Sequence, residues 1–286
     1  MGASPASAAD LSDYPGDPGD LYLTVAENTT LPKLGGGTFT AADEDIVYFH
    51  AAERQYELFF DGSDVGLSGA TIDAVEVTDG FFLSFTSARS VSGISGTVDD
   101  SDIVRFEPAS LGSTTAGTFF PRVDGSEFGL TSDGEDIDAF SVIDDRFFFS
   151  TTGDFSIPTS SGTVSGQDED IFECMDDGCD EGAKILLNFT ASGLSSDSED
   201  VDAFAMAGGG DLSENVLLST TGSFSASGLS AANEDVVACD DRSSHDASGI
   251  TCTGSKVKFV KYFDGNTRSI DGNVTGVDWA FEPGSE

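Results

Sequence analysis

Short runs of carboxylates recur along the chain, each directly before an apolar stretch typical of a β-strand. They are Asp43-Glu44-Asp45, Asp100-Ser101-Asp102, Asp168-Glu169-Asp170 and Asn233-Glu234-Asp235. Ca²⁺ takes six to eight oxygen ligands from Asp, Glu and backbone carbonyls, and it tolerates irregular loops. The runs therefore predict bound calcium. The preferred side-chain ligands are Asp45, Asp102, Asp170 and Asp235.

A second set of aspartates stands inside apolar strands, beginning with Ile72-Asp73-Ala74-Val75. An Asp beside an apolar face can satisfy neighbouring backbone N–H groups instead of binding a metal, so these residues rank second as ligands. The set consists of Asp73, Asp138, Asp202 and Asp278. Neither set follows the 12-residue spacing of an EF-hand loop.

Two other interpretations of the acidic runs remain open. An Asp before a strand often caps a turn through its own side chain, and Asp-Gly is a common turn dipeptide. A strongly acidic surface also keeps a protein soluble in a saline habitat. Carboxylates brought together repel each other by about 1 kcal/mol per pair at ~4 Å in water, and by more where water is excluded. Lys is scarce in these loops, which favours a bound cation.

The four cysteines form two local pairs. Cys174 and Cys179 bracket Met-Asp-Asp-Gly, and Cys239 and Cys252 bracket a polar insertion. Four thiolates could bind one metal ion, but such sites usually show C-x₂-C spacing, which neither pair has. We therefore predict two disulfides and an oxidising, extracellular compartment.

The sequence contains no recognisable catalytic motif. His50 and His245 have no nucleophile motif around them, and phosphate-binding and dinucleotide-binding fingerprints are absent. Carboxylate pairs such as those of glycoside hydrolases are too abundant here to be informative. A hydrolase that acts on glycans or esters through carboxylates at a channel mouth remains an alternative, and the protein is more typical of a non-enzyme.

The net charge excludes two classes of partner. The chain has 286 residues with 52 Asp and Glu against 12 Lys and Arg, a formal charge of −40. Binding of nucleic acid needs clustered Lys and Arg, and an anionic membrane surface repels such a chain. No apolar run is long enough to span a membrane. The first ten residues are small and polar, and we expect residues 1–19 to be a flexible segment outside the folded domain, which starts at residue 20.

Four types of strand repeat four times, at starts separated by 60, 66 and 69 residues. The first type begins at Leu21, Phe81, Phe147 and Val216. The second follows the acidic runs. The third is aromatic or aliphatic, occurs in 57–63, 118–126, 184–192 and 258–266, and often leads into Asp-Gly. The fourth contains the strand aspartates. Four strands in each of four repeats predict an all-β, four-bladed propeller, since the coils of a β-solenoid are much shorter.

The order of the strands predicts how the ring closes. The chain begins with the first strand type and ends with the fourth, at Val277-Asp278-Trp279-Ala280. If the fourth type is innermost, the C-terminal strand completes the N-terminal blade and removes a sheet edge. Loss of residues 276–286 should then unfold the whole domain cooperatively. In this arrangement Trp279 serves packing at the closure.

The strand-turn-strand segments IDAVEVTDGFFLSF and DIDAFSVIDDRFFFS resemble the repeat of hemopexin-type four-bladed propellers. The resemblance covers about fifteen residues of each repeat. It implies that the backbone around Asp73, Asp138, Asp202 and Asp278 faces a central channel, which in that family holds ions. The chain lacks the family's aromatic-Trp-Arg strand and its cysteine pair between the first and last blades. The repeat is also similar to repeats of secreted bacterial proteins.

Together these features favour a secreted or cell-surface binding or adhesion module that is not catalytic and is stabilised by calcium. Its partner would be an extracellular protein or glycan. A structural subunit of a surface layer or filament, self-associating through Ca²⁺, is a further alternative. The structure should place both acidic loops of each repeat on one face of the disc, because alternate strands of a blade run parallel.

Overall fold

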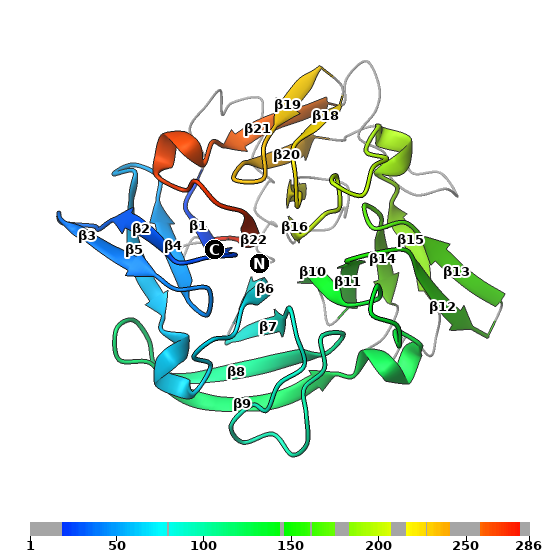
Figure 1. Ribbon diagram of the computed structural model, residues 1–286, viewed down its shortest axis with the longest axis horizontal. Coiled ribbons are helices and arrows are strands. Elements are labelled where there is room, and N and C mark those ends of the chain that lie inside the picture. Colours follow the sequence, from blue (N-terminus) through cyan, green and yellow to red (C-terminus); the bar gives the residue numbers. More distant parts are fainter. Residues whose placement is uncertain are drawn as a thin grey trace, which may run out of the picture.

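The computed structural model describes residues 19–78, 80–143, 146–160, 162–174, 183–206, 216–226, 228–240 and 258–280. Within these ranges, four antiparallel sheets of four strands surround one axis like the blades of a propeller (Figure 1). The predicted all-β, four-bladed architecture is confirmed. Residues 1–18 lie outside the described part of the chain.

Each blade is built from one strand of each predicted type. From the axis outwards, blade 1 contains β22 (Val274–Trp279), β1 (Leu21–Val25), β4 (Ile46–His50) and β5 (Gln55–Phe60). Blade 2 contains β6 (Ile72–Val77), β7 (Phe81–Phe85), β8 (Ile103–Ser110) and β9 (Ala116–Val123). Blade 3 contains β10 (Ile137–Ile143), β11 (Arg146–Thr151), β14 (Ile171–Cys174) and β15 (Ala183–Leu187). Blade 4 contains β16 (Ala203–Met206), β17 (Val216–Ser219), β20 (Val236–Asp240) and β21 (Lys258–Phe263).

The ring closes as the sequence predicts. β22, from the C-terminal end of the described chain, pairs antiparallel with β1 from the N-terminal end, with Leu23 opposite Val277. The side chain of Trp279 packs edge-on against Tyr262, with ring centroids 5.1 Å apart. Blade 1 is thus assembled from both ends of the described chain.

The register of β22 differs from the prediction. Thr24 of β1 lies opposite Gly276, just as Ser84 of β7 lies opposite Ala74. The residue before each of these, Thr275 or Asp73, is the extra residue of a β-bulge. Thr275 therefore occupies the position of the strand aspartates, and the prediction that Asp278 is their fourth member is wrong by three residues. Asp278 instead corresponds to Glu76, further along the innermost strand.

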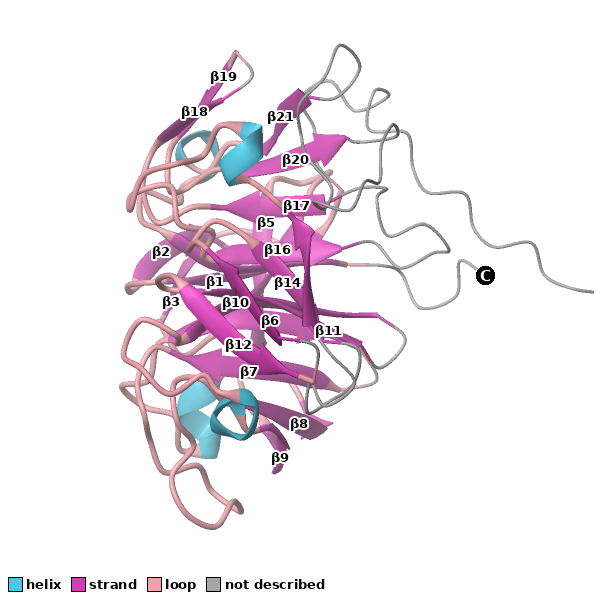
Figure 2. Ribbon diagram, turned by 90° about the vertical axis from the view of Figure 1, so that its right-hand side faces the viewer, coloured by secondary structure: helices cyan, strands magenta, loops and turns pink. Residues whose placement is uncertain are grey.

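Three short hairpins were not anticipated from the sequence. They are β2 (Thr29–Pro32) with β3 (Thr38–Ala41), β12 (Phe155–Thr159) with β13 (Gly162–Gly166), and β18 (Phe224–Ala226) with β19 (Leu229–Ala231). Each is inserted between the second and third strands of its blade, and the labelled hairpin strands lie on one side of the disc (Figure 2). Their strands have three to five residues and are rich in Ser, Thr and Gly, so they carry little hydrophobic periodicity.

Aromatic side chains fill the space between the blades. Phe147 and Phe149 stack with ring centroids 5.8 Å apart, and Phe60 meets Phe106 edge-on at 5.2 Å. Such pairs contribute beyond the area that they bury. No helix among the described residues is long and apolar enough to cross a membrane.

The two cysteines in the described ranges, Cys174 and Cys239, are buried and carry no free thiol. Their predicted partners, Cys179 and Cys252, lie outside the described residues. The two pairings therefore remain a prediction.

The closing strand yields a test. Ala stands opposite Ser in the other three blades, yet a methyl group on Gly276 would lie 2.5 Å from Oγ1 of Thr24 and 3.2 Å from the backbone N of Val75. We expect Gly276→Ala to lower the free energy of unfolding by about 1–3 kcal/mol, as overpacking does. Chemical denaturation measures this. Adding Thr24→Ser should recover part of the loss, and a single variant as stable as the wild type would contradict the register described above.

Candidate functional site

The first-ranked aspartates fasten loops to each other. In blade 1, the Asp45 carboxylate accepts hydrogen bonds from the backbone N of Ala42 at 2.9 Å and of Gly62 at 3.1 Å. The first bond closes the acidic turn, and the second joins that turn to the loop that leaves the outermost strand. The other three residues of the set repeat both bonds: Asp102 with Asp99 and Gly125, Asp170 with Gln167 and Phe189, and Asp235 with Ala232 and Gly265. We call these four aspartates the loop clasps.

The Asp-Gly dipeptides serve the same fastening. Asp61 accepts from the backbone N of Ser63 and so caps the short 3-10 helix η2 (Gly62–Val65). A Cβ atom on Gly62 would lie 2.2 Å from the carbonyl oxygen of Glu44, so only glycine allows the loop to approach the acidic turn this closely. The same arrangement recurs at Asp124 and Gly125, with η3 (Gly125–Phe128).

The acidic turn of one blade also contacts the next blade. The carbonyl oxygen of Asp43 accepts a hydrogen bond from the N–H of Ile72 at 3.0 Å, and that of Asp100 accepts from Ile137 at 3.3 Å. The acidic turn, which precedes the third strand from the axis, and the loop before the innermost strand of the next blade therefore lie on one face of the disc, as the sequence predicts.

These contacts explain the repeated loop aspartates without a metal ion. Each clasp accepts hydrogen bonds from backbone N–H groups of two loops, as the turn-capping interpretation expects. In the described ranges, no three His, Cys, Asp or Glu side chains are arranged so that they could hold a metal ion by themselves. Calcium at Asp45, Asp102, Asp170 and Asp235 remains a prediction.

At the axis, polar side chains link the innermost strands to one another. Oδ2 of Asp278 on β22 accepts from the N–H of Val77 on β6 at 2.7 Å. The hydroxyl of Ser141 on β10 donates to Glu76 on β6 at 3.0 Å and accepts from the N–H of Met206 on β16 at 3.2 Å. Burial raises the pKa of Asp278 to about 7. Burial, followed by the charge of Asp278, raises the pKa of Glu76 well above its usual value.

The strand aspartates that directly precede the Ala paired with Ser are more than nine-tenths buried, and each has at least one carboxylate oxygen without a hydrogen-bond partner. Oδ1 of Asp73 accepts from the Ser84 hydroxyl at 2.6 Å, while its Oδ2 has no hydrogen-bond partner. Asp202 accepts from the side-chain amide of Asn273 through one oxygen only. Asp138 is 4% exposed, and neither of its oxygens has a partner. The structure therefore groups Asp73, Asp138 and Asp202 at the axis and places Asp278 elsewhere along it.

Asp200, which directly precedes the innermost segment of blade 4, belongs with this group. Burial, followed by the charges of Asp202 and Asp168, raises the pKa of Asp200 to about 8. At the junction of blades 4 and 1, the equivalent residues Asn273 and Asp202 are hydrogen-bonded, so the repeat places Asp200 beside Asp138. Burial, followed by the charge of Asp200, raises the pKa of Asp138 well above its usual value. The sequence shows the Glu199-Asp200 pair, but only the fold reveals which of the two faces the axis.

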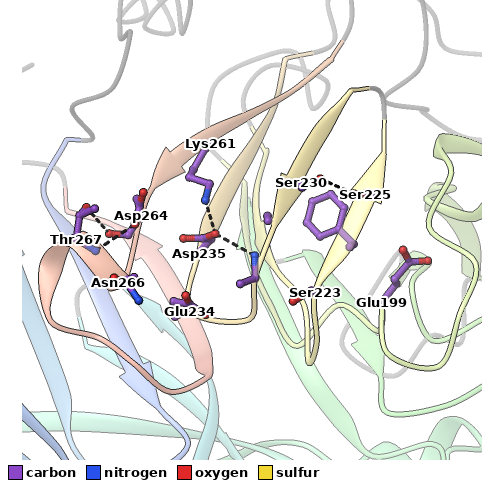
Figure 3. Close-up of a pocket in the computed structure, with 13 residues that line it drawn as sticks. Glu199, Ser223, Ser225, Ser230, Glu234, Asp235, Lys261, Asp264, Asn266 and Thr267 are labelled. Atoms are coloured by element: carbon purple, nitrogen blue, oxygen red, sulfur yellow. Dashed lines mark hydrogen bonds and ion pairs between the residues drawn. The ribbon is translucent and has the colours of Figure 1, made fainter.

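A polar groove of about 660 Å³ lies on the hairpin face of blade 4 (Figure 3). On its floor, Nζ of Lys261 pairs with Oδ2 of Asp235 at 2.6 Å. Leu58, Pro121 and Ile185 occupy the position of Lys261 in the other blades, according to the strand register. Most of the remaining lining consists of carboxylates, hydroxyls and an amide: Glu199, Glu234, Asp264, Ser223, Ser225, Ser230, Thr267 and Asn266. Phe224, Ala231 and Ala232 supply the apolar part.

Comparisons with known proteins add little. No family model matches the sequence, and no curated protein matches it. Among solved structures, the chain is similar to a protein described as the extracellular domain of a one component system from B. thetaiotaomicron. The identity is 10%, the TM-score is 0.30, and the match covers 89% of this chain and 36% of that one. A likeness of this degree supports no inference about the present chain.

The clasps give a second testable prediction. Asp102→Ala leaves the N–H groups of Asp99 and Gly125 without their acceptor, so we expect a loss of about 1–3 kcal/mol in the free energy of unfolding. The matched control is Asp133→Ala, at an exposed position of the same face, which should change stability by less than about 0.5 kcal/mol. Equal losses in Ca²⁺ and in chelator are expected. If Ca²⁺ stabilises the wild type and Asp102→Ala abolishes that effect, the result would contradict the capping interpretation and support a calcium ion bound at the acidic loop.

The axis gives a pH prediction. Since the pKa values of Glu76 and Asp278 are raised in the fold, their contribution to stability is complete below their unfolded pKa values of about 4. The contribution of Asp278 is lost as the pH rises through about 7, and that of Glu76 is lost as the pH rises through its own raised pKa. We expect the free energy of unfolding to fall between pH 5 and pH 8, as measured by urea denaturation. Glu76→Gln keeps the bond with Ser141 and should flatten the slope. An unchanged slope in this variant would contradict the assignment.

Proposed function

We propose that the protein is an extracellular, non-catalytic binding module that holds a glycan in the groove of blade 4. The observation that carries this proposal is the change from an aliphatic side chain or proline to Lys261 at one position of the repeat, together with the polar groove around it. The fold does not require this change, because the other three blades are built without it. Function placed on a rigid scaffold through such local variation is common in repeat folds.

The chemistry of the groove suits a ligand with many hydroxyl groups. Sugar hydroxyls both donate and accept hydrogen bonds. The groove offers acceptors at Glu199, Glu234 and Asp264, and donors at Asn266 and Lys261. Its volume lies within the range of sites for small ligands. Lys261, which lies beside Asp235, does not create a site for an anion.

An extracellular location is supported by the absence of free thiols at Cys174 and Cys239. Disulfides persist in oxidising compartments. The hydrolase alternative finds no support at the axis. Asp138 and Asp200 are 4% and 5% exposed, too deeply buried for a substrate to reach.

The test is binding to an array of neutral oligosaccharides, followed by titration of any glycan retained. Asn266→Ala and Ser230→Ala should each weaken binding about fivefold, the effect of losing a hydrogen bond worth ~1 kcal/mol. Ser165→Ala is the matched control, because Ser165 lies across a hairpin from Ser156 in blade 3 as Ser230 lies across from Ser225 in blade 4.

Binding that Ser165→Ala weakens as strongly as Ser230→Ala would exclude the blade 4 groove. Retention of no glycan would contradict the proposed ligand class, and release of cleaved sugar would contradict a non-catalytic role.

A further inference from the structure

Three positions meet wherever one blade joins the next. The first is the residue before the Ala or Gly of the innermost strand that pairs with Ser or Thr, which is a bulge residue in blades 1 to 3. The second is the first residue of the acidic turn in the same blade, and the third is the residue just before the innermost segment of the following blade. Between blades 1 and 2 the three residues are Thr275, Asp43 and Thr71, and between blades 2 and 3 they are Asp73, Asp100 and Asp136. Between blades 3 and 4 they are Asp138, Asp168 and Asp200, and between blades 4 and 1 they are Asp202, Asn233 and Asn273. The middle two junctions thus hold three acids each, and the outer two hold one.

The single acid of each outer junction receives a hydrogen bond from a neutral side chain. The Thr71 hydroxyl donates to Asp43 at 3.0 Å, and the Asn273 amide donates to Asp202. In both cases the donor is the residue that precedes the next innermost strand. These junctions lie on either side of blade 1, where the two ends of the chain meet.

The junction between blades 3 and 4 lacks such a donor. By the strand register, Asp138 and Asp200 stand where Asp202 and Asn273 stand at the closing junction, so a carboxyl group takes the place of the amide that donates to Asp202 there. Both oxygens of Asp138 and Oδ1 of Asp200 are buried without a hydrogen-bond partner among the described residues. Two buried carboxylates in contact need positive charge or a shared proton between them.

We propose that a hard divalent cation of the Ca²⁺ type binds between Asp138 and Asp200 and joins blade 3 to blade 4. The ion occupies the place that the Asn273 amide nitrogen takes beside Asp202. Since no three acidic side chains converge on one point, backbone carbonyls and water complete its coordination, which Ca²⁺ accepts readily. This site is independent of the blade 4 groove and of the glycan proposal.

The proposal is tested on the intact protein after treatment with chelator, by calorimetric titration with CaCl₂ and by thermal unfolding. We expect Ca²⁺ to bind, and Tm to rise by about 5–10 °C at a hundredfold excess over Kd. Asp200→Asn, which copies the closing junction, should bind one ion fewer per chain. In chelator it should be at least as stable as the wild type, because the repulsion is gone.

Asp278→Asn is the matched control. Asp278 is also buried at the axis, but both of its oxygens accept backbone N–H groups, so this variant should bind as many ions as the wild type. If Asp200→Asn does not fold, Asp138→Asn serves the same comparison. Wild-type protein that binds neither Ca²⁺ nor Mg²⁺ would overturn the proposal, leaving a shared proton between the carboxyl groups. An Asp200→Asn variant that binds as many ions as the wild type would overturn it as well.

Discussion

The four innermost strands bring carboxyl groups to a single axis, where water is largely excluded. A carboxylate taken out of water is costly unless it accepts hydrogen bonds or meets a positive charge, and neighbouring carboxylates make the cost larger. Asp138 is the extreme case, being 4% exposed with both oxygens unpartnered. The propeller therefore depends on how each blade junction neutralises or solvates its acid.

The junctions divide into two kinds along the chain. Those on either side of blade 1 use Thr and Asn as donors, so each of these junctions holds a single acid beside the blade that β22 and β1 form together. A low charge here favours closure of the ring, because β1 and β22 come from opposite ends of the described chain and no short loop holds them together. The junctions on either side of blade 3 concentrate acid between covalently connected neighbours, where a bound cation can act as a further link. Further out, each loop clasp fastens its acidic turn by accepting hydrogen bonds from two backbone N–H groups.

Much of the fold could be predicted from the sequence, because four strand types recur in one order and the chain begins and ends within the same blade. The register of β22 could not. Val277-Asp278-Trp279 resembles Ile72-Asp73-Ala74 by residue type, whereas the pairing is fixed by the bulge at Thr275 and by the fit of Thr24 against Gly276. The inserted hairpins were missed because strands of a few Ser, Thr and Gly residues have no apolar alternation.

For the candidate sites, residue type alone could not separate capping from metal binding. Asp45 and Asp138 are both aspartates in repeated motifs, yet Asp45 accepts two backbone N–H groups and Asp138 accepts none. The difference is set by which loop or blade packs against each side chain, and only the three-dimensional structure reveals that. The same holds for Lys261, whose departure from the repeat becomes visible once the strand register is known.

The most direct measurement is a crystal structure of the protein grown with CaCl₂, with anomalous scattering used to locate calcium. The account predicts an anomalous peak between Asp138 and Asp200, at about 2.3–2.6 Å from oxygens of both carboxylates. Density without a peak, and with the two carboxyl groups about 2.5–2.7 Å apart as in a shared-proton hydrogen bond, would contradict it.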